Sequence, residues 1–150
     1  PKLLAESKNV VVMPGDCPLI SSEEMASLAE NFGTGEKLRF LTANFPNPSG
    51  FGRVLRGKAD GVIGIVEEKD ANDTQRQIKE INSSIYIFDR ALLEAGLKQL
   101  KPANAQGEYY LTDLIDFTVQ RGEKVSALRL NSPELIKKLT CFMLRIIVWN

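Results

Sequence analysis

Asp16 is the first residue in the chain whose position points to chemistry. It follows Pro14 and Gly15, and residues 9–13 before them form a short apolar, β-branched run that is typical of a buried strand. In open α/β sheets, ligands bind beyond the carboxyl ends of the strands. A carboxylate there, beside a glycine that lets a ligand approach the backbone, suits Mg²⁺ bound together with substrate phosphates. The alternative is a simple turn in which Asp16 accepts hydrogen bonds from nearby amides.

Two further groups lie next to predicted strands. Gly50 and Gly52 frame a bend before Arg53, which either offers backbone amides to an oxygen-rich ligand or only meets a need for positive φ. The charged run from Glu67 to Asp70 ends the second strand of a predicted hairpin. Charged residues in such a place usually form a solvated edge, so from spacing alone Glu67 is a weak candidate.

Polar side chains also occur where the pattern is otherwise apolar or helical. Asn82 lies within an apolar strand, where its amide must find partners, so it either bonds a neighbouring loop or faces a polar ligand. Glu108, Tyr110 and Thr112 lie at a junction between a loop and a helix. Their side chains either bind the hydroxyl groups of a sugar or, for Glu108 and Thr112, cap the helix.

The composition excludes several classes of function. The chain of 150 residues has 19 basic and 19 acidic residues, so its zero net charge predicts neither nucleic-acid binding nor attraction to anionic membranes. It contains no histidine, which excludes Ser-His-Asp and Cys-His catalysis and every histidine metal site. The longest apolar tract is too short to cross a bilayer and contains Arg145. Cys17 and Cys141 fit no metal or redox spacing and are expected to be free thiols.

The elements that must position these residues alternate between strand and helix. This order predicts an α/β domain with an inserted β-hairpin, and the run at 9–13 favours a parallel sheet covered on both faces. Ser21 or Ser22 and then Asp89 are expected to cap helices. The strands are expected at 9–13, 37–43, 53–56, 62–66, 80–90 and 124–130, and the helices at 21–33, 90–100 and 111–122.

Five segments in this order resemble one known family: GDCPLI, PSGFGRV, GIVEEKDA, DTQRQIKEIN and NAQGEYYLTD. From Val10 to Leu130 the chain is similar to the pyrophosphorylase domain of the bacterial bifunctional N-acetylglucosamine-1-phosphate uridylyltransferase and glucosamine-1-phosphate acetyltransferase. The resemblance implies a Rossmann-like nucleotidyltransferase sheet. It also implies a cytoplasmic, Mg²⁺-dependent enzyme of peptidoglycan precursor synthesis, with no nucleic-acid or membrane partner. Such an enzyme joins UTP and N-acetylglucosamine 1-phosphate into UDP-N-acetylglucosamine and releases pyrophosphate.

The resemblance also implies residue roles. Asp16 would bind Mg²⁺, and Gly15 would lie against the nucleotide. The sugar phosphate would attack the α-phosphorus of UTP in line, with Mg²⁺ neutralising the developing charge and no covalent intermediate. The residues that would hold the N-acetylglucosamine moiety are Gly52, Glu67, Asn82, Tyr110 and Thr112.

The sequence departs from the family in several places. No counterpart of the family's Gly-rich phosphate-binding loop is found, so residues 1–150 are expected to form a partial domain that lacks its N-terminal half and turns over poorly. The acetyltransferase β-helix domain, through which full-length members trimerise, is also expected to be absent. Residues 133–150 form an apolar tail, which is either a terminal strand or an altered reading of the native terminus. Asn82, Ser83 and Ser84 stand where the family has Asn-Thr-Gly, and Pro14 replaces an aromatic residue.

Two other functions stay open at this point. One is a related sugar nucleotidyltransferase of the same fold that uses another sugar or base. The other is a fragment that binds a sugar nucleotide without catalysis.

Overall fold

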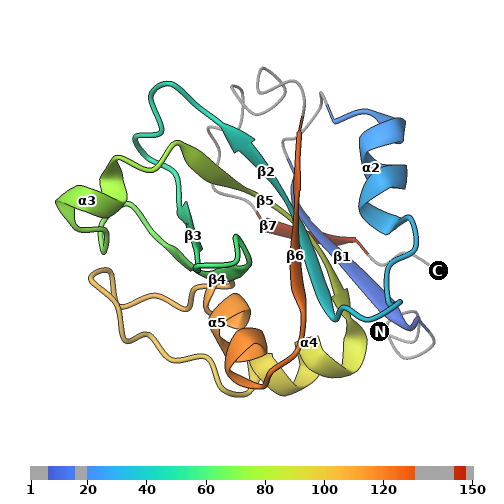
Figure 1. The fold of residues 1–150 in the computed structure, drawn as a ribbon. Helices are drawn as coiled ribbons and strands as arrows, with labels where there is room; N and C mark the ends of the chain where they lie inside the picture. The colour runs from blue at the N-terminus through green and yellow to red at the C-terminus, as the bar shows by residue number, and fades with distance from the viewer. Residues whose placement is uncertain (1–6, 16–19, 131–143, 148–150) are drawn as a thin grey trace.

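The strand β5, Glu80–Asp89, is the centre of the sheet in the computed structural model, which describes residues 7–15, 20–130 and 144–147 (Figure 1). It pairs along one edge with β2, and its other edge is shared by β1 and β3. Among the described residues the sheet has seven strands in the order β4-β3-β5-β1-β7, with β2 and β6 extending from β5. The remaining strands are β1 (Asn9–Pro14), β2 (Leu38–Asn44), β3 (Arg53–Arg56), β4 (Val62–Val66), β6 (Val125–Arg129) and β7 (Leu144–Ile147).

The direction of the strands differs from the parallel arrangement expected for residues 9–13. β1 runs antiparallel to both of its neighbours, β5 and β7, and β2 with β6 is the one parallel pair found within the described ranges. The apolar run was correctly assigned as a buried strand, since Val10, Val11 and Val12 are each at most 4% exposed. Burial on both faces gives the same apolar run whichever way the neighbouring strands point, so the pattern alone does not determine their direction.

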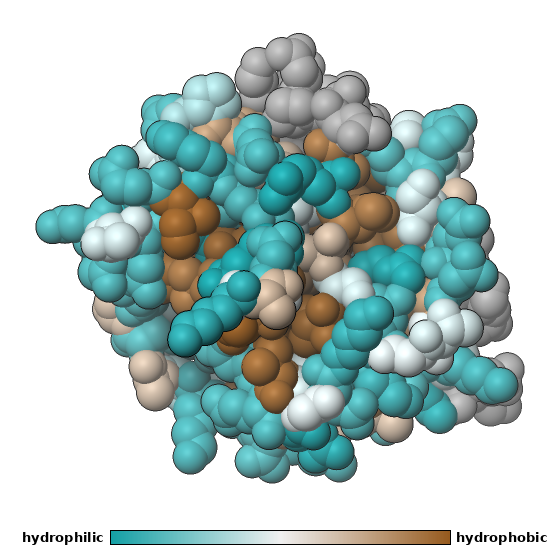
Figure 2. Space-filling view, viewed as in Figure 1, coloured by the Kyte–Doolittle hydropathy of each residue, from teal (hydrophilic) through white to brown (hydrophobic). Residues whose placement is uncertain are grey.

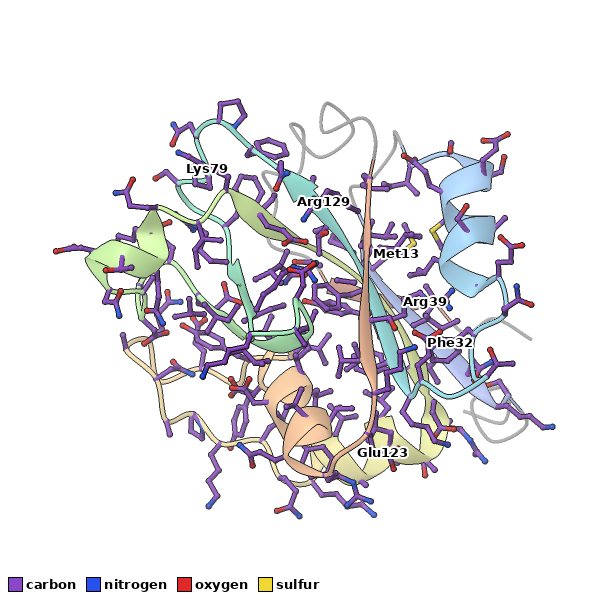
Figure 3. The ribbon with its side chains drawn as sticks, in the orientation of Figure 1. Met13, Phe32, Arg39, Lys79, Glu123 and Arg129 are labelled. Carbon is purple, nitrogen blue, oxygen red and sulfur yellow. The ribbon has the colours of Figure 1, made fainter. Side chains whose placement is uncertain are left out.

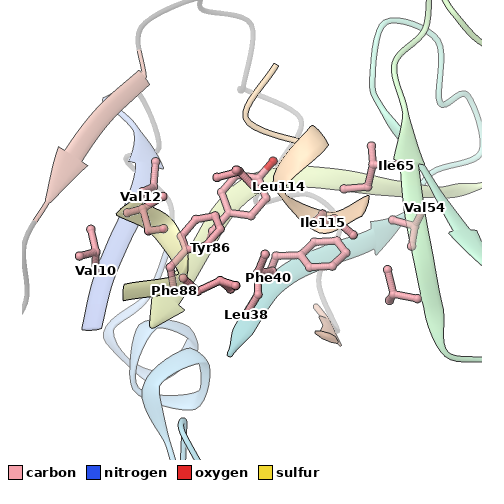
Figure 4. Packing of buried hydrophobic residues seen from close by; sticks show 13 residues of the cluster. Val10, Val12, Leu38, Phe40, Val54, Ile65, Tyr86, Phe88, Leu114 and Ile115 are labelled. Atoms are coloured by element: carbon pink, nitrogen blue, oxygen red, sulfur yellow. The ribbon is translucent and has the colours of Figure 1, made fainter. Parts of the chain in front are cut away.

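Helices cover both faces of the sheet (Figure 1). On one face, Leu28 of α2 (Ser22–Ala29) packs in a cluster with Val11 and Leu41. On the other face, Leu93 of α4 (Arg90–Leu97) and Leu114 of α5 (Asp113–Gln120) pack with the aromatic rings of β2 and β5 (Figure 4). Alternate residues of β1 and β5 therefore enter opposite cores, which is the α/β layering expected from the sequence.

Local capping explains where the helices begin. Ser21 forms a capping box with Glu24, and the Asp89 carboxylate accepts the backbone N–H of Leu92 at 3.0 Å, as expected from the sequence. The helices are shorter than predicted: α2 ends before Gly33. A further helical turn, α3 (Asp73–Arg76), was not predicted and begins with its own capping box at Asn72.

Arg39 fastens α2 to the sheet (Figure 3). Its guanidinium donates to the carbonyl oxygens of Leu28 and Glu30 at the end of α2, and it lies 5.7 Å from the centre of the Phe32 ring. A cation at a helix C-terminus satisfies carbonyl groups that have no partner within the helix.

The face of the molecule seen in Figure 2 is mostly polar. In the view of Figure 2, hydrophilic residues surround hydrophobic ones near the centre of this face. Within the part of the chain that the structure describes, no helix combines the length and the apolar character that crossing a membrane requires.

Candidate functional site

Three of the predicted site residues lie side by side across three strands. Arg53 of β3 is paired with Val66 of β4 and with Ile81 of β5. Continuing these two antiparallel registers by one residue places Gly52 between Glu67 and Asn82. The backbone N–H of Asn82 donates to the carbonyl oxygen of Gly52 at 2.9 Å. A Cβ atom at Gly52 would lie 3.1 and 3.2 Å from the two carboxylate oxygens of Glu67, so a larger residue would press on this carboxylate.

Thr112 brings α5 to the same place. Its hydroxyl donates to Glu67 Oε1 at 2.9 Å, although 45 residues separate the two in the chain. Thr112 is the residue before the first turn of α5, yet its side chain makes no capping hydrogen bond. The helix-cap explanation of Thr112 is therefore wrong, because the hydroxyl faces Glu67 instead of the helix. We call Gly52, Glu67, Asn82 and Thr112 the Glu67 cluster.

Asn82 has a defined orientation in this cluster. Its Oδ1 accepts the backbone N–H of Ser84 at 3.0 Å, and its Nδ2 donates to the Tyr86 hydroxyl at 2.6 Å. Ser84 has φ of +62°, and the pairing of β2 with β5 shifts between Phe40 and Thr42, so Ser83 and Ser84 form a bulge. The bulge places Asn82 and Tyr86, four residues apart, within reach of each other.

A buried arginine supports the bend before β3. Arg53, which is 1% exposed, donates to the carbonyl oxygen of Phe51 and to Glu68 Oε2, the latter at 2.7 Å. Glu68 Oε2 also accepts the backbone N–H of Gly50 at 3.0 Å. Glu68 is therefore tied to the structure and is not a freely solvated edge residue, and the Arg53–Glu68 pair holds the bend that contains Gly52.

Tyr110 lies on the loop that leads into α5. Its hydroxyl accepts a hydrogen bond from Gln106 Nε2 at 2.6 Å. The same loop is held by two contacts with the turn after β4: Lys69 Nζ donates to Gln106 Oε1, and Asp70 Oδ1 accepts the backbone N–H of Ala105. Burial, with the charges of Asp70 and Glu67, raises the pKa of Tyr110 although Gln106 lowers it. Tyr110 is thus beside the Glu67 cluster without a direct contact to it among the hydrogen bonds found.

The remaining two predicted residues belong to the end of β1. Gly15 is exposed and directly follows this strand, whereas Asp16 lies outside the described residues. Because β1 runs antiparallel to β5 with Val12 opposite Tyr86, its next residues run toward the Asn82 end of β5. Gly15 and the Glu67 cluster therefore lie toward the same end of β5.

The surroundings of Glu67 shift its pKa upward. Burial raises the pKa of Glu67, and the nearby charges of Asp113 and Asp70 raise it further, while the Thr112 hydroxyl and Arg53 lower it. Burial also raises the pKa of Tyr86 far above its ordinary value, with a contribution from the charge of Glu67. A carboxyl group, a carboxamide and hydroxyl groups without a net positive charge suit a ligand that carries hydroxyl and amide groups, such as a sugar.

A match to a known family accompanies this fold and site. The chain belongs to the nucleotidyl transferase family, whose family model matches residues 2–134. The chain is similar to the protein named bifunctional protein GlmU in several bacteria, which confirms the resemblance seen in the sequence. It is 46% identical over 134 residues, or 89% of the chain, to that of Pelotomaculum thermopropionicum, and 41% identical over 128 residues, or 85%, to that of Caldanaerobacter subterraneus. It spans 29% and 28%, respectively, of the length of these relatives.

A solved structure shares the fold. It is from Bacillus anthracis and is assigned as a glucose-1-phosphate thymidylyltransferase. The TM-score is 0.56 at 20% sequence identity, and the match covers 83% of this chain and 44% of the other. This agreement confirms the α/β nucleotidyltransferase fold predicted from the sequence.

Tyr86 and the Arg53–Glu68 pair were not singled out as site residues from the sequence. In a regular strand Asn82 and Tyr86 would share a face but lie about 13 Å apart, so their contact depends on the bulge and no local pattern indicates it. Arg53 directly follows Gly52 and was read only as the end of the bend. Buried arginines are rare, so nothing in the sequence indicated that Arg53 would be buried.

Proposed function

We propose that the Glu67 cluster holds the sugar of a nucleotide sugar, and that the chain contributes this sugar site to Mg²⁺-dependent uridylyl transfer from UTP to N-acetylglucosamine 1-phosphate. The observation that carries the proposal is that Asn82 of β5 meets Gly52, Glu67 and Thr112, which flank β3, β4 and α5, at one spot. The similarity to proteins named GlmU supports the choice of this sugar and nucleotide. Tyr110, beside the cluster, would close the sugar site from the loop side.

Each member of the cluster would have a defined task. Gly52 leaves room for the Glu67 carboxylate beside its backbone, because even a Cβ would crowd Glu67. Asn82 retains one N–H of its carboxamide and one lone pair of Oδ1 for a ligand. Glu67 would accept hydrogen bonds from sugar hydroxyl groups, since Thr112 uses only part of its acceptor capacity. Holding the sugar in this way would orient its phosphate for in-line attack.

The residues fit a Mg²⁺ ion that is held mainly by its substrates. Within residues 7–15, 20–130 and 144–147, no group of three or more aspartates, glutamates or cysteines is placed to hold a metal ion. Mg²⁺ usually binds through one or two carboxylates together with waters and phosphate oxygens, so Asp16 would supply one carboxylate and the nucleotide would supply the phosphate oxygens. The ion would neutralise charge on the phosphates during transfer. Gly15, beside Asp16 and exposed, would let the nucleotide approach the backbone.

Calorimetry on the full chain with Mg²⁺ tests this proposal. We expect UDP-N-acetylglucosamine to bind more tightly than UDP-glucose and ADP-glucose, because the amide and hydroxyl groups of its sugar match the cluster. Asn82→Ala is expected to weaken the binding of UDP-N-acetylglucosamine about tenfold, as expected for one lost polar contact, while the exposed Glu94→Gln leaves it unchanged. Asp16→Ala is expected to remove the dependence of nucleotide binding on Mg²⁺.

The other outcomes identify the alternatives. Equal affinity for the three nucleotide sugars would argue for a transferase with another sugar or base. Binding of UDP-N-acetylglucosamine by a longer protein that shows no pyrophosphate release would favour a role in binding without catalysis. A Mg²⁺ dependence that survives Asp16→Ala would remove Asp16 from the site.

A further inference from the structure

Tyr86 occupies an unusual position at the boundary between the core and the Glu67 cluster. Its ring is 2% exposed and packs between Phe40 and Phe88, with ring centres 6.0 and 5.6 Å away (Figure 4). Its hydroxyl accepts a hydrogen bond from Asn82 Nδ2 at 2.6 Å, and both side chains are buried. The ring therefore acts as a rigid support, and only its oxygen reaches the site.

The backbone fixes the direction of this hydrogen bond. The N–H of Ser84 can only donate, so the atom of Asn82 that accepts it must be Oδ1. The other end of the carboxamide, Nδ2, is consequently the donor toward Tyr86, and the phenol oxygen is the acceptor. The proton of the phenol then points elsewhere, and both Ser84 and Glu67 are close enough to influence the ionisation of Tyr86.

We infer that Tyr86 is a positioning residue that locks the Asn82 carboxamide with one N–H and one Oδ1 lone pair facing the sugar. Without the phenol oxygen, Asn82 Nδ2 would lose its buried acceptor, and the carboxamide would be held only at Oδ1 by the Ser84 N–H, so it could turn more easily about its last bond. A rotated amide presents its donor and acceptor in the wrong places to a ligand. This inference rests on the proposed function, because it assumes that Asn82 contacts the sugar.

Tyr86→Phe is the direct test, because phenylalanine keeps the ring in the core and removes only the oxygen. We expect the dissociation constant of UDP-N-acetylglucosamine to rise about tenfold, the usual effect of one hydrogen bond, and that of UDP to stay the same. The matched control is Tyr109→Phe, which removes a hydroxyl from a residue that is 68% exposed. Calorimetry on the full chain provides both constants for each variant.

A double-mutant cycle separates positioning from a purely structural role. Once Asn82→Ala has removed the carboxamide, adding Tyr86→Phe should not weaken the binding of UDP-N-acetylglucosamine any further. A purely structural role would lower the unfolding midpoint of Tyr86→Phe but leave the affinity for UDP-N-acetylglucosamine unchanged, and this result would overturn the inference alone. Equal losses for UDP and UDP-N-acetylglucosamine would overturn it too. No binding of UDP-N-acetylglucosamine by the unsubstituted chain would overturn the proposed function and, with it, the inference.

Discussion

At the scale of single residues, Ser84 is the clearest case of a conformation that its side chain does not favour. Its φ of +62° lies in the left-handed region, which costs a residue other than glycine about 1–2 kcal/mol. The resemblance in the sequence places a glycine of the related family at this position. The serine therefore keeps a glycine-type backbone, and Asn82 Oδ1 helps to hold it by accepting the Ser84 N–H.

The stability of Ser84 variants should depend on how well the new residue tolerates a left-handed backbone conformation. Ser84→Gly is expected to leave the free energy of unfolding unchanged or to raise it by up to about 1 kcal/mol, since glycine adopts this φ without strain. Ser84→Val is expected to lower it by about 2 kcal/mol or more, because a β-branched residue is disfavoured there. Urea unfolding measures both values.

The neighbouring serine is the control for Ser84. Ser83 does not have positive φ, and its Oγ accepts the N–H of Ile85 at 3.2 Å. Ser83→Gly should therefore lower the stability. If Ser83→Gly and Ser84→Gly had the same effect, the backbone conformation of Ser84 would not be the reason.

At the scale of secondary-structure elements, the beginnings of α4 and α5 look alike in the sequence and differ in the structure. Asp89 caps α4 through the N–H of Leu92, whereas Thr112 before α5 donates its hydroxyl to Glu67. Both residues are good helix caps by type, so local sequence predicts the same role for both. The difference arises from the distant strand β4, which delivers Glu67 to one of them and not to the other.

Thr112→Val should therefore affect Glu67 more than the helix. The Thr112 hydroxyl lowers the pKa of Glu67, so we expect this pKa to rise in the variant, as measured by NMR titration of the carboxyl group. The helical content of α5 should not change. Asp89→Ala is the contrasting variant: it should destabilise the chain by about 1 kcal/mol through loss of the cap. Fraying of α5 in Thr112→Val, with an unchanged Glu67 pKa, would contradict this account.

The bend before β3 depends on the Arg53–Glu68 pair in a way that can be measured. Glu68→Gln removes the charge that Arg53 faces and weakens the bond to the N–H of Gly50. We expect faster amide hydrogen exchange at Gly50 and a loss of about 1.5–3 kcal/mol in the free energy of unfolding, the range for hydrogen bonds to charged groups. Glu30→Gln, at an exposed residue after α2, is the control. Unchanged exchange at Gly50 would show that the bend is held by other contacts.

Much of this element-level description follows from the sequence, and the reason for the rest is physical. The hairpin, the central strand and the caps at Ser21 and Asp89 depend on residues close in the chain, so local patterns identify them. The direction of β1 and the contact between Thr112 and Glu67 depend on residues that are far apart in the chain. Local sequence patterns do not indicate such pairing. Tyr86 was missed for a related reason: within an apolar strand, a tyrosine has the same pattern as any core residue.

At the scale of the whole molecule, Glu80 joins four strands at one buried point. Its carboxylate accepts hydrogen bonds from Arg56 of β3, through two nitrogens at 2.7 Å, and from Thr42 of β2 at 2.8 Å. Arg129 of β6 lies 3.2 Å from Oε2. Although burial alone would raise the pKa of Glu80, these partners outweigh it and lower this pKa below its ordinary value.

The lowered pKa sets the sign of a pH effect on stability. A carboxyl group whose pKa is lower in the folded state stabilises the fold above its unfolded pKa, about 4.3, and this stabilisation is lost as the pH falls through the folded pKa. We expect Glu80→Gln to cost about 2 kcal/mol at pH 7 and progressively less below pH of about 4, as measured by urea unfolding at several pH values. Glu94→Gln, on the exposed side of α4, should have no effect at any pH. A cost that is independent of pH would show that the charge of Glu80 is not involved.

The position of β5 at the centre of the sheet also has a consequence for synthesis of the chain on the ribosome. β1 and β2 do not pair with each other, and each finds its partner in β5, whose residues are made only after both. Until residue 89 has left the ribosome, the hairpin of β3 and β4 is the one strand pairing available among the described residues up to that point. The apolar strands β1 and β2 therefore stay open to chaperones and proteases until β5 emerges, and the sheet closes at that point.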